Sequence, residues 1–282
     1  MTEIAGAIDF SHTDFSHTEF CMGTAFTFHG RSPLSNTQTK FAMDAACRLL
    51  HAADETFSLY KPESPLSRLA RGETSVAKCP PEVSEIWDAC EEWEKTTDGW
   101  FSAFTPQHTF DPSGLVKTWA ANQAAESLLA AGISDFTLNA GGDILLSDDL
   151  SDPLAWRVAI HTPVSIADSK AGILTVVDLT DTRFRAVATS GSAERGAHIW
   201  NPKAPGKEPA NKLVQVSVVA RDLVSADVWA TAAFAQGNRA IDLINAHNLR
   251  NPQTSIQVLA IDQAGNLSAT EGFMDLFAKP SE

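Results

Sequence analysis

Apolar residues recur at helical spacing over much of the first half of the chain. Over residues 37–53 they fall every three or four positions, which predicts an amphipathic helix. A second helix with one apolar face is predicted between the Pro-Pro pair at 80–81 and the Asp-Gly pair at 98–99. The Ala- and Leu-rich stretch at 115–131 predicts a third helix.

Segments typical of strands dominate the second half. They fall at residues 136–138, 144–146, 154–162, 173–180, 184–190 and 213–220, and one earlier strand is predicted at 20–28, with Gly23 inside it. A helical region at about 225–247, broken at Gly237-Asn238, and a hairpin over 255–270 complete the chain. Because helices cluster early and strands cluster late, the pattern indicates the α+β class, with mixed or antiparallel sheets and flanking helices.

Composition narrows the class of protein. The 282 residues carry a formal net charge of −14, and 44% of them are hydrophobic. These values exclude a disordered chain, and the acidic balance argues against a nucleic-acid binder or a protein that docks on anionic lipid. No stretch reaches the ~18 apolar residues of a membrane span, and the first residues do not resemble a signal peptide, so we expect a cytoplasmic protein.

Cysteine and histidine give no spacing typical of a metal site. The four cysteines form no CxxC motif, so we expect free thiols, and the eight histidines form no HxxxH or HExxH pair, which argues against a His-ligated zinc site. The pentads FSHTD and FSHTE at 10–14 and 15–19 form a short repeat. We expect residues 1–19 to be a leader, flexible in part, that runs into the first strand; a His-rich metal-binding arm is the alternative.

The segment SADVWAT at 225–231 offers a carboxylate and a hydroxyl on one helix face. Ser225 is a good N-cap, Asp227 is expected in the first turn, and Asp227 and Thr231 are spaced i,i+4. Two hard oxygen ligands suit Mg²⁺ better than zinc. The alternative is that Asp227 only complements the helix dipole.

Other segments are weaker signals when each is taken alone. FDPSGLVK at 110–117 is a turn that leads into a helix, with Lys117 expected in the first turn, near phosphate or simply in solvent. NAGGD at 139–143 permits close backbone approach, but an ordinary structural turn explains it better. Tyr60, the only tyrosine, can stack on a flat ligand or pack in the core, and a lone histidine such as His198 is more often structural than catalytic.

The order of these segments carries more information than any one of them. Seven blocks follow one another in the chain: MGTAF at 22–26, FSLYKPESPLSRL at 57–69, FDPSGLVK at 110–117, NAGGDI at 139–144, ATSG at 188–191, HIWNP at 198–202 and SADVWAT at 225–231. In this order they resemble the FAD:protein FMN transferase family (ApbE, flavin transferase). The resemblance implies an ApbE-like α+β fold, with residues 20–282 as a single catalytic domain whose two lobes share a central cleft.

The resemblance also implies a reaction and a set of site residues. Members of the family use Mg²⁺ to split FAD, transfer FMN through a phosphoester bond to a Thr or Ser hydroxyl of an acceptor protein, and release AMP. The implied metal ligands are Asp227, Thr231, the backbone of Ala230 where some members have a second Asp, and the carbonyl of Gly114. The implied FAD contacts are Met22, Tyr60, Trp100, Phe101, Ser102, Asp111, Lys117, Ser190 and Ile199, and the implied catalytic residues are Lys117, Asp227 and His198, the last to orient the acceptor hydroxyl or support its loop.

The chain also departs from the family pattern. Thr118 and Trp119 stand where the family usually has Gly-Tyr, Asn122 replaces a common Asp, and Ser102 stands where a carboxylate is expected. These departures keep two alternatives open. One is an FAD pyrophosphatase that yields free FMN and AMP, and the other is a non-catalytic FAD-binding protein. For the transferase, the expected acceptor is an intracellular protein, with no nucleic acid and no membrane span involved.

Overall fold

The computed structural model describes residues 12–107, 109–163, 172–191, 199–204 and 213–278. Its helices are α1 (Asn36–Phe57), α2 (Pro65–Ala70), α3 (Pro81–Thr96), α4 (Ser113–Ala130), α5 (Leu223–Gln236), α6 (Ala240–Arg250) and α7 (Glu271–Met274), with short 3₁₀ turns at Val76–Lys78, Pro153–Trp156, Gly237–Arg239 and Pro252–Thr254. Within these residues, no helix combines the length and the apolar character needed to cross a bilayer.

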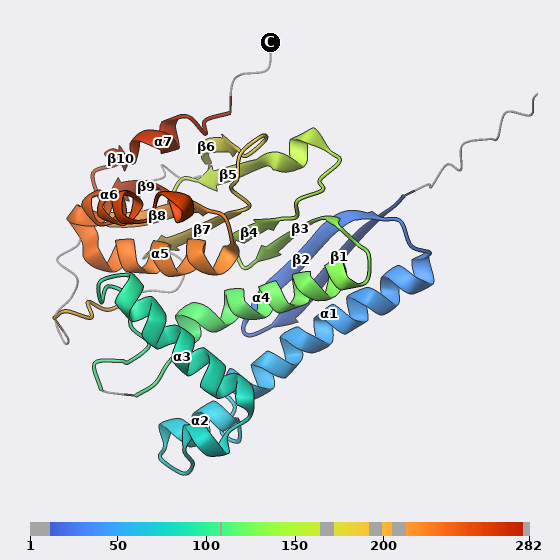
Figure 1. Ribbon diagram of the computed structural model, residues 1–282, viewed down its shortest axis with the longest axis horizontal. Helices are drawn as coiled ribbons and strands as arrows, with labels where there is room; N and C mark the ends of the chain where they lie inside the picture. The colour runs from blue at the N-terminus through green and yellow to red at the C-terminus, as the bar shows by residue number, and fades with distance from the viewer. Residues whose placement is uncertain (1–11, 108, 164–171, 192–198, 205–212, 279–282) are drawn as a thin grey trace, which may run out of the picture.

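One large antiparallel sheet organises the molecule (Figure 1). Its strands are β1 (Thr13–Cys21), β2 (Thr24–Ser32), β3 (Asp135–Ala140), β4 (Asp143–Leu146), β7 (Ala186–Gly191), β8 (Leu213–Ala220), β9 (Gln257–Asp262) and β10 (Leu267–Ala269), in that spatial order. Between β4 and β7 the chain leaves this sheet to form a separate antiparallel pair, β5 (Arg157–His161) and β6 (Ile173–Asp178). Chain order and spatial order therefore agree apart from this one excursion.

The two faces of the sheet are covered differently (Figure 1). Helices α1, α4 and α5 lie along one face, with α1 packed on α4 and α4 packed on α5. Residues of alternating strand positions, such as Ala186 and Ala188 of β7, join the large apolar core under these helices. Val187, which lies between them, joins a second core that is closed by β5, β6 and α7. The strands at the middle of the sheet are thus buried on both faces, as their nearly continuous apolar runs require.

Most of the predicted elements are confirmed. The predicted helix at 37–53 is α1, the helix between the Pro-Pro and Asp-Gly pairs is α3, and the helix at 115–131 is α4, which ends just before Gly132 at φ +88°. The break predicted at Gly237-Asn238 falls on the 3₁₀ turn between α5 and α6, and β9 and β10 form the predicted hairpin. The α+β class with an antiparallel sheet and flanking helices is confirmed.

The predictions for the first residues were wrong in two respects. The strand expected at 20–28 is two strands, because Met22 and Gly23 both have positive φ and form a two-residue hairpin turn between β1 and β2. Gly23 therefore lies in a turn rather than inside a strand. Residues 13–19, expected as leader, form most of β1. The division of residues 20–282 into two lobes around a cleft stays a prediction.

Candidate active site

Helix α5 carries Asp227, the acidic residue of the SADVWAT segment, in the interior of the protein. Asp222, rather than the expected Ser225, is the N-cap: its carboxylate accepts from the Ser225 backbone N–H at 2.8 Å and from the Ser225 hydroxyl at 2.7 Å. The helix therefore begins at Leu223, which places Asp227 in the second turn instead of the first. Asp227 is buried, and Thr231, one turn further along the same face, is half-buried. The position deep in the helix argues against a simple dipole role for Asp227.

Lys117 of α4 meets Asp227 across the interface between the two helices. Its Nζ lies 3.5 Å from Asp227 Oδ2 and donates a hydrogen bond to Asp143 Oδ2. Because α4 begins at Ser113, Lys117 lies in its second turn and not, as expected, in the first. Only 14% of the lysine side chain is exposed, so the alternative of a solvated lysine is wrong. The 110–117 segment and the 225–231 segment, far apart in sequence, are thus in direct contact.

Asp143, which accepts the hydrogen bond from Lys117, was not predicted from the sequence as a site residue. It begins β4 directly after Gly141 and Gly142, whose φ values are +65° and +103°. A Cβ atom on Gly141 would lie 2.3 Å from the Thr24 hydroxyl oxygen, so the turn requires glycine there. Asp143 Oδ1 accepts from the Thr189 backbone N–H of β7 at 3.0 Å. An acid placed directly after a Gly-Gly turn in a resembling block was the signal that could have identified it.

Burial dominates the electrostatics of the group that Lys117, Asp143 and Asp227 form. Desolvation raises the pKa of Asp227 to about 6; Lys117 opposes this shift and the carboxylate of Asp143 adds to it. The Thr118 hydroxyl lies 3.2 Å from Asp227 Oδ2 and 3.2 Å from the Leu115 carbonyl oxygen, and its one proton can serve either acceptor. Among the residues that the structure describes, one lysine thus faces two buried carboxylates, and these three side chains carry one excess negative charge when both carboxylates are ionised.

The surroundings of Asp227 fit a hard divalent cation. The Thr231 hydroxyl lies 3.3 Å from the hydroxyl of Ser190 on β7, so two hydroxyl oxygens meet one helical turn from the carboxylate. Ala230, which directly precedes Thr231 in the chain, is fully buried, and its side chain offers no ligand atom. Oxygen donors combined with an uncompensated buried carboxylate are the chemistry that Mg²⁺ prefers. Asp227, Thr231 and Ser190 could hold such a cation, with backbone carbonyls completing the set.

The turn before α4 packs against the segment that follows α3. A Cβ atom on Gly114 would lie 3.3 Å from the ring of Phe101, which is buried, so glycine permits this close approach. The Asp111 backbone N–H donates to the Ala103 carbonyl at 2.7 Å, and its carboxylate accepts from the Ser113 backbone N–H at 3.0 Å. Asp111 therefore orders the start of α4, and Phe101 packs against the first turn of this helix at Gly114.

A surface cleft of about 330 Å³ opens between the segment that follows α3 and residues 200–203. Its wall consists of Glu94, Gly99, Ser102, Phe104, Thr105, Pro106, Trp200, Pro202 and Lys203. Lys203 Nζ lies 4.7 Å from the centre of the Trp100 ring, in a cation–π contact. The cleft is large enough for part of a small-molecule ligand, although Lys117, Asp143 and Asp227 do not line it.

The remaining predicted residues are dispersed. Met22 lies in the β1–β2 turn and packs partly against the main core, as does Ile199. Tyr60 is 97% exposed, so the core alternative for this side chain is wrong. The Trp119 ring packs edge-on against Phe57 at 5.7 Å instead of reaching the Asp227 side of α4. His198 lies outside the residues that the structure describes.

Comparisons with known proteins match the chain to one family. The profile of the ApbE family matches residues 22–107 and 103–251. The FAD:protein FMN transferase of Vibrio cholerae is 29% identical over 140 residues, which are 47% of this chain and 40% of that protein. The enzyme of the same name from Rhodobacter capsulatus is 33% identical over 175 residues, 58% of this chain and 30% of that protein. The matched stretch is thus less than half the length of either relative.

Solved structures extend the likeness to almost the whole fold. The flavin transferase ApbE from Vibrio cholerae superposes with a TM-score of 0.75 at 19% identity, covering 94% of this chain and 99% of that one. The ApbE protein from Thermotoga maritima gives a TM-score of 0.75 at 17% identity, covering 95% of this chain and 100% of that one. Because the profile spans most of the sequence and the fold agrees throughout, the chain belongs to the ApbE family.

Proposed function

We infer that this protein transfers FMN from FAD to a Thr or Ser hydroxyl of an acceptor protein, in a reaction that depends on Mg²⁺ and releases AMP. The observation that carries this proposal is the meeting of Lys117, Asp143 and Asp227 from three separate elements, next to the Ser190–Thr231 hydroxyl pair. Membership of the ApbE family supports the choice of reaction, since the relatives named above are FAD:protein FMN transferases.

In this proposal Asp227 and Thr231 hold the metal, together with the backbone carbonyls of Gly114 and Ala230. When bound, Mg²⁺ supplies Lewis acidity toward a diphosphate and neutralises developing negative charge. Asp143 accepts from Lys117 and from the Thr189 backbone N–H, and so fixes where the ammonium group stands. Lys117 thereby brings a fixed positive charge beside Asp227, where it can balance part of the phosphate charge of FAD.

The proposed transfer forms one P–O bond and breaks another. The acceptor hydroxyl oxygen bonds to the phosphorus of the FMN half, the P–O bond to the bridging oxygen breaks, and AMP leaves with that oxygen. The hydroxyl proton passes to a base or to solvent, and His198 is kept as the residue proposed to orient the acceptor hydroxyl or support its loop. Positioning and charge neutralisation carry most of the rate enhancement in such transfers. We place the flavin portion at the cleft that Ser102 lines, near Trp100. Phe101, between these two residues in the chain, packs against Gly114 and so relates this segment to the start of α4. The other proposed FAD contacts are Met22, Tyr60, Asp111, Ser190 and Ile199.

The test is incubation of the purified protein with FAD, Mg²⁺ and an acceptor domain that carries a flavinylation site. We expect the acceptor to gain the mass of an FMN phosphoester and to fluoresce in a denaturing gel, with one AMP released per FMN attached. Replacing the acceptor Thr or Ser by Ala is the matched control and should leave the acceptor mass unchanged.

Two other outcomes would identify a different activity. Release of FMN and AMP with no change in acceptor mass would identify a pyrophosphatase, in which water replaces the hydroxyl. Tight FAD binding without AMP release, in the presence of Mg²⁺, would identify a non-catalytic binding protein. Thr118, which departs from the family pattern and contacts Asp227, is the residue to revert to Gly in that case.

A further inference from the structure

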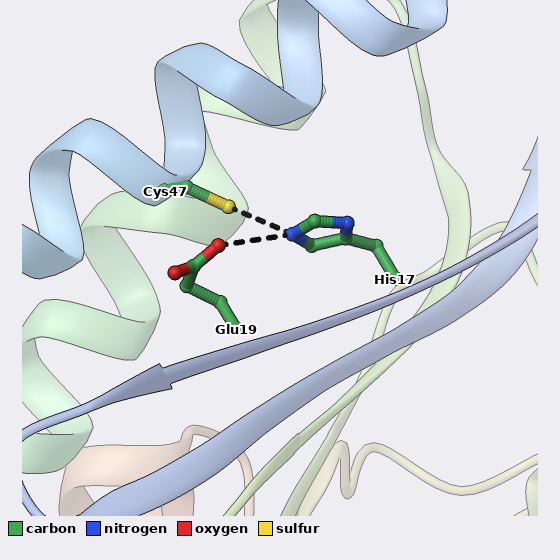
Figure 2. Close-up of side chains that lie close together, drawn as sticks. All are labelled: His17, Glu19 and Cys47. Atoms are coloured by element: carbon green, nitrogen blue, oxygen red, sulfur yellow. Dashed lines mark hydrogen bonds and ion pairs between the residues drawn. The ribbon is translucent and has the colours of Figure 1, made fainter.

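A second group of metal-binding side chains lies far from Asp227 in sequence, between strand β1 and helix α1. Figure 2 shows His17 and Glu19 extending from β1 toward Cys47 of α1. His17 and Glu19 are spaced i,i+2 on a strand, which places both on the face that α1 covers. Cys47 and His51 are spaced i,i+4 on the helix, which places both on one helical face. Two elements therefore bring four potential ligands together.

The distances within this group are those of ligands around one small cation. His17 Nε2 lies 3.2 Å from Glu19 Oε2 and 3.3 Å from Cys47 Sγ, and the three ligand atoms all lie within 4.8 Å of one another. A tetrahedral zinc ion with bonds of about 2.0–2.3 Å separates its nitrogen, oxygen and sulfur ligands by roughly 3.3–3.6 Å. The two separations from His17 Nε2 lie within a few tenths of an ångström of these values, and the ligand atoms of Glu19 and Cys47 lie within 4.8 Å of each other, so side-chain movements would bring all three to one ion.

The donor set selects the type of metal. Imidazole nitrogen and thiolate sulfur favour zinc and other borderline or soft divalent ions, whereas Mg²⁺ and Ca²⁺ take oxygen ligands. One thiolate and one carboxylate also balance the two positive charges of the ion, so that a metal held between β1 and α1 leaves no excess charge. The group therefore differs from the proposed metal ligands at Asp227 and Thr231, which are oxygen atoms only.

His51 supports the carboxylate of this group from the other side. Its Nε2 lies 2.9 Å from Glu19 Oε1, the oxygen that does not face His17. A ligating carboxylate is commonly held in place by such an outer hydrogen bond, and removal of the outer partner weakens metal binding. About half of the His51 side chain is exposed, so the group opens to solvent and a metal ion can reach it.

We propose that His17, Glu19 and Cys47 form a binding site for Zn²⁺, with solvent at the fourth position and His51 as a positioning residue for Glu19. On binding, the Cys47 thiol gives its proton to solvent and the thiolate bonds to the metal. Within the described sheet β1 pairs with β2 alone and is an edge strand. The site would therefore fasten this edge strand to α1, and we expect bound Zn²⁺ to stabilise the strand against local unfolding.

The first test uses the wild-type protein. After treatment with a chelator, the protein is titrated with Zn²⁺ or with Co²⁺ as its spectroscopic substitute, with Mg²⁺ in excess to occupy the oxygen-ligand site. We expect one Zn²⁺ per chain, and with Co²⁺ the charge-transfer absorption of a thiolate ligand. Zn²⁺ should also slow alkylation of Cys47 by iodoacetamide while Cys79, which lies outside the group, reacts at an unchanged rate.

The second test uses matched variants. Cys47→Ser and His17→Gln should weaken Zn²⁺ binding by at least about 100-fold, and His51→Gln by about 10- to 100-fold. The controls Cys79→Ser and His29→Gln change the same residue types elsewhere and should leave the affinity unchanged. Circular dichroism of each variant shows whether it folds, and the alkylation experiment does not depend on any variant.

Three results would overturn the proposal. They are a wild-type protein that retains less than one Zn²⁺ per chain, a Co²⁺ complex without thiolate absorption, and Zn²⁺ binding by folded Cys47→Ser or His17→Gln as tight as that of the wild type. Because none of these measurements uses FAD or an acceptor, they are independent of the proposed flavin transfer.

Discussion

Two groups of charged and polar side chains in this fold differ in how deeply they are buried. Lys117, Asp143 and Asp227 join two helices to β4 in the middle of the sheet, and their side chains are 14%, 3% and 8% exposed. His17 and Glu19 join the edge strand β1 to α1, and their side chains are 37% and 25% exposed. Buried charges in the first group must be compensated by one another, whereas water partly screens the more exposed charges of the second group.

This difference in burial is reflected in the pKa values of Asp227 and Glu19. Burial raises the pKa of Asp227, while the hydrogen bond from His51 is the main cause that lowers the pKa of Glu19. The charge of Asp227 is therefore costly until a cation compensates it, whereas the charge of Glu19 is already supported by hydrogen bonds. Four experiments would break or sharpen this contrast, and they follow in order of expected effect.

The largest effect is expected from loss of the buried cation. Lys117→Ala leaves Asp143 and Asp227 buried without their counter-charge, so we expect the free energy of unfolding of the metal-free protein at pH 8 to fall by about 3–5 kcal/mol. His17→Ala breaks a partly exposed pair and should cost less than about 1 kcal/mol. Urea denaturation measures both changes, with the exposed Lys95→Ala as the control. Equal losses of unfolding free energy for Lys117→Ala and His17→Ala would show that burial does not distinguish the two groups.

The second effect concerns catalysis. Asp227→Ala removes the proposed metal carboxylate, and we expect flavin transfer to fall by about 10²–10³-fold, the range seen when one group that stabilises developing charge is lost. Zn²⁺ affinity should not change in this variant, because Asp227 lies outside the group formed by His17, Glu19 and Cys47. The rate of FMN attachment to the acceptor is the measurement, with Asp242→Ala, an exposed helical aspartate, for comparison. Full transfer by Asp227→Ala would contradict the metal role.

The third effect is a pH dependence of stability in the absence of metal. Burial raises the pKa of Asp227 from 3.8 to about 6, so the folded protein keeps a proton that the unfolded chain has lost. The stability that this provides is complete below about pH 4 and is lost as the pH rises through about 6. The difference amounts to at most about 3 kcal/mol.

Asp227→Asn isolates this contribution, because it keeps the shape of the side chain and cannot titrate. We expect the stability of the wild type relative to Asp227→Asn to fall between pH 4 and pH 7 in the presence of EDTA, as measured by urea denaturation. A difference that stays constant over this range would show that Asp227 titrates normally and that burial does not control its charge.

The smallest effect is expected from the Thr118 hydroxyl. Thr118→Val keeps the shape of the side chain and removes the donor that lies 3.2 Å from Asp227 Oδ2. We expect a loss of about 1 kcal/mol in the free energy of unfolding at pH 8, where Asp227 is ionised, and a smaller loss at pH 4. Thr96→Val, on the exposed end of α3, is the control. An equal loss at both pH values would mean that the hydroxyl serves the Leu115 carbonyl instead.

Local signals succeeded where neighbouring residues decide the structure. The periodicity at 37–53 and 115–131, the Pro-Pro pair before α3 and the Gly237-Asn238 break all depend on contacts within a few residues. The prediction of one strand at 20–28 was wrong because a two-residue turn at Met22-Gly23 leaves little trace between two strand-forming segments. Asp222 took the N-cap from Ser225 because two nearby polar residues both suit that position.

Long-range contacts account for the residues that were missed. Asp143 was passed over because its role comes from Lys117, 26 positions earlier in the chain, and from Thr189 on a neighbouring strand. The spacing rules that argued against a histidine metal site consider one segment at a time. They could not detect a pair on a strand and a pair on a helix that meet only after β1 and α1 pack together.

The sequence by itself determined the α+β class, the approximate positions of most elements and the family resemblance, because periodicity, turn residues and the order of the blocks are written along the chain. Only the tertiary structure decided which side chains share a site and how much water they retain. The physical reason is that pairing of charges and ligands depends on distances across packed elements, and burial then sets the cost of each charge. Asp227 and Glu19 are the same functional group, and their places in the fold give them opposite shifts of pKa.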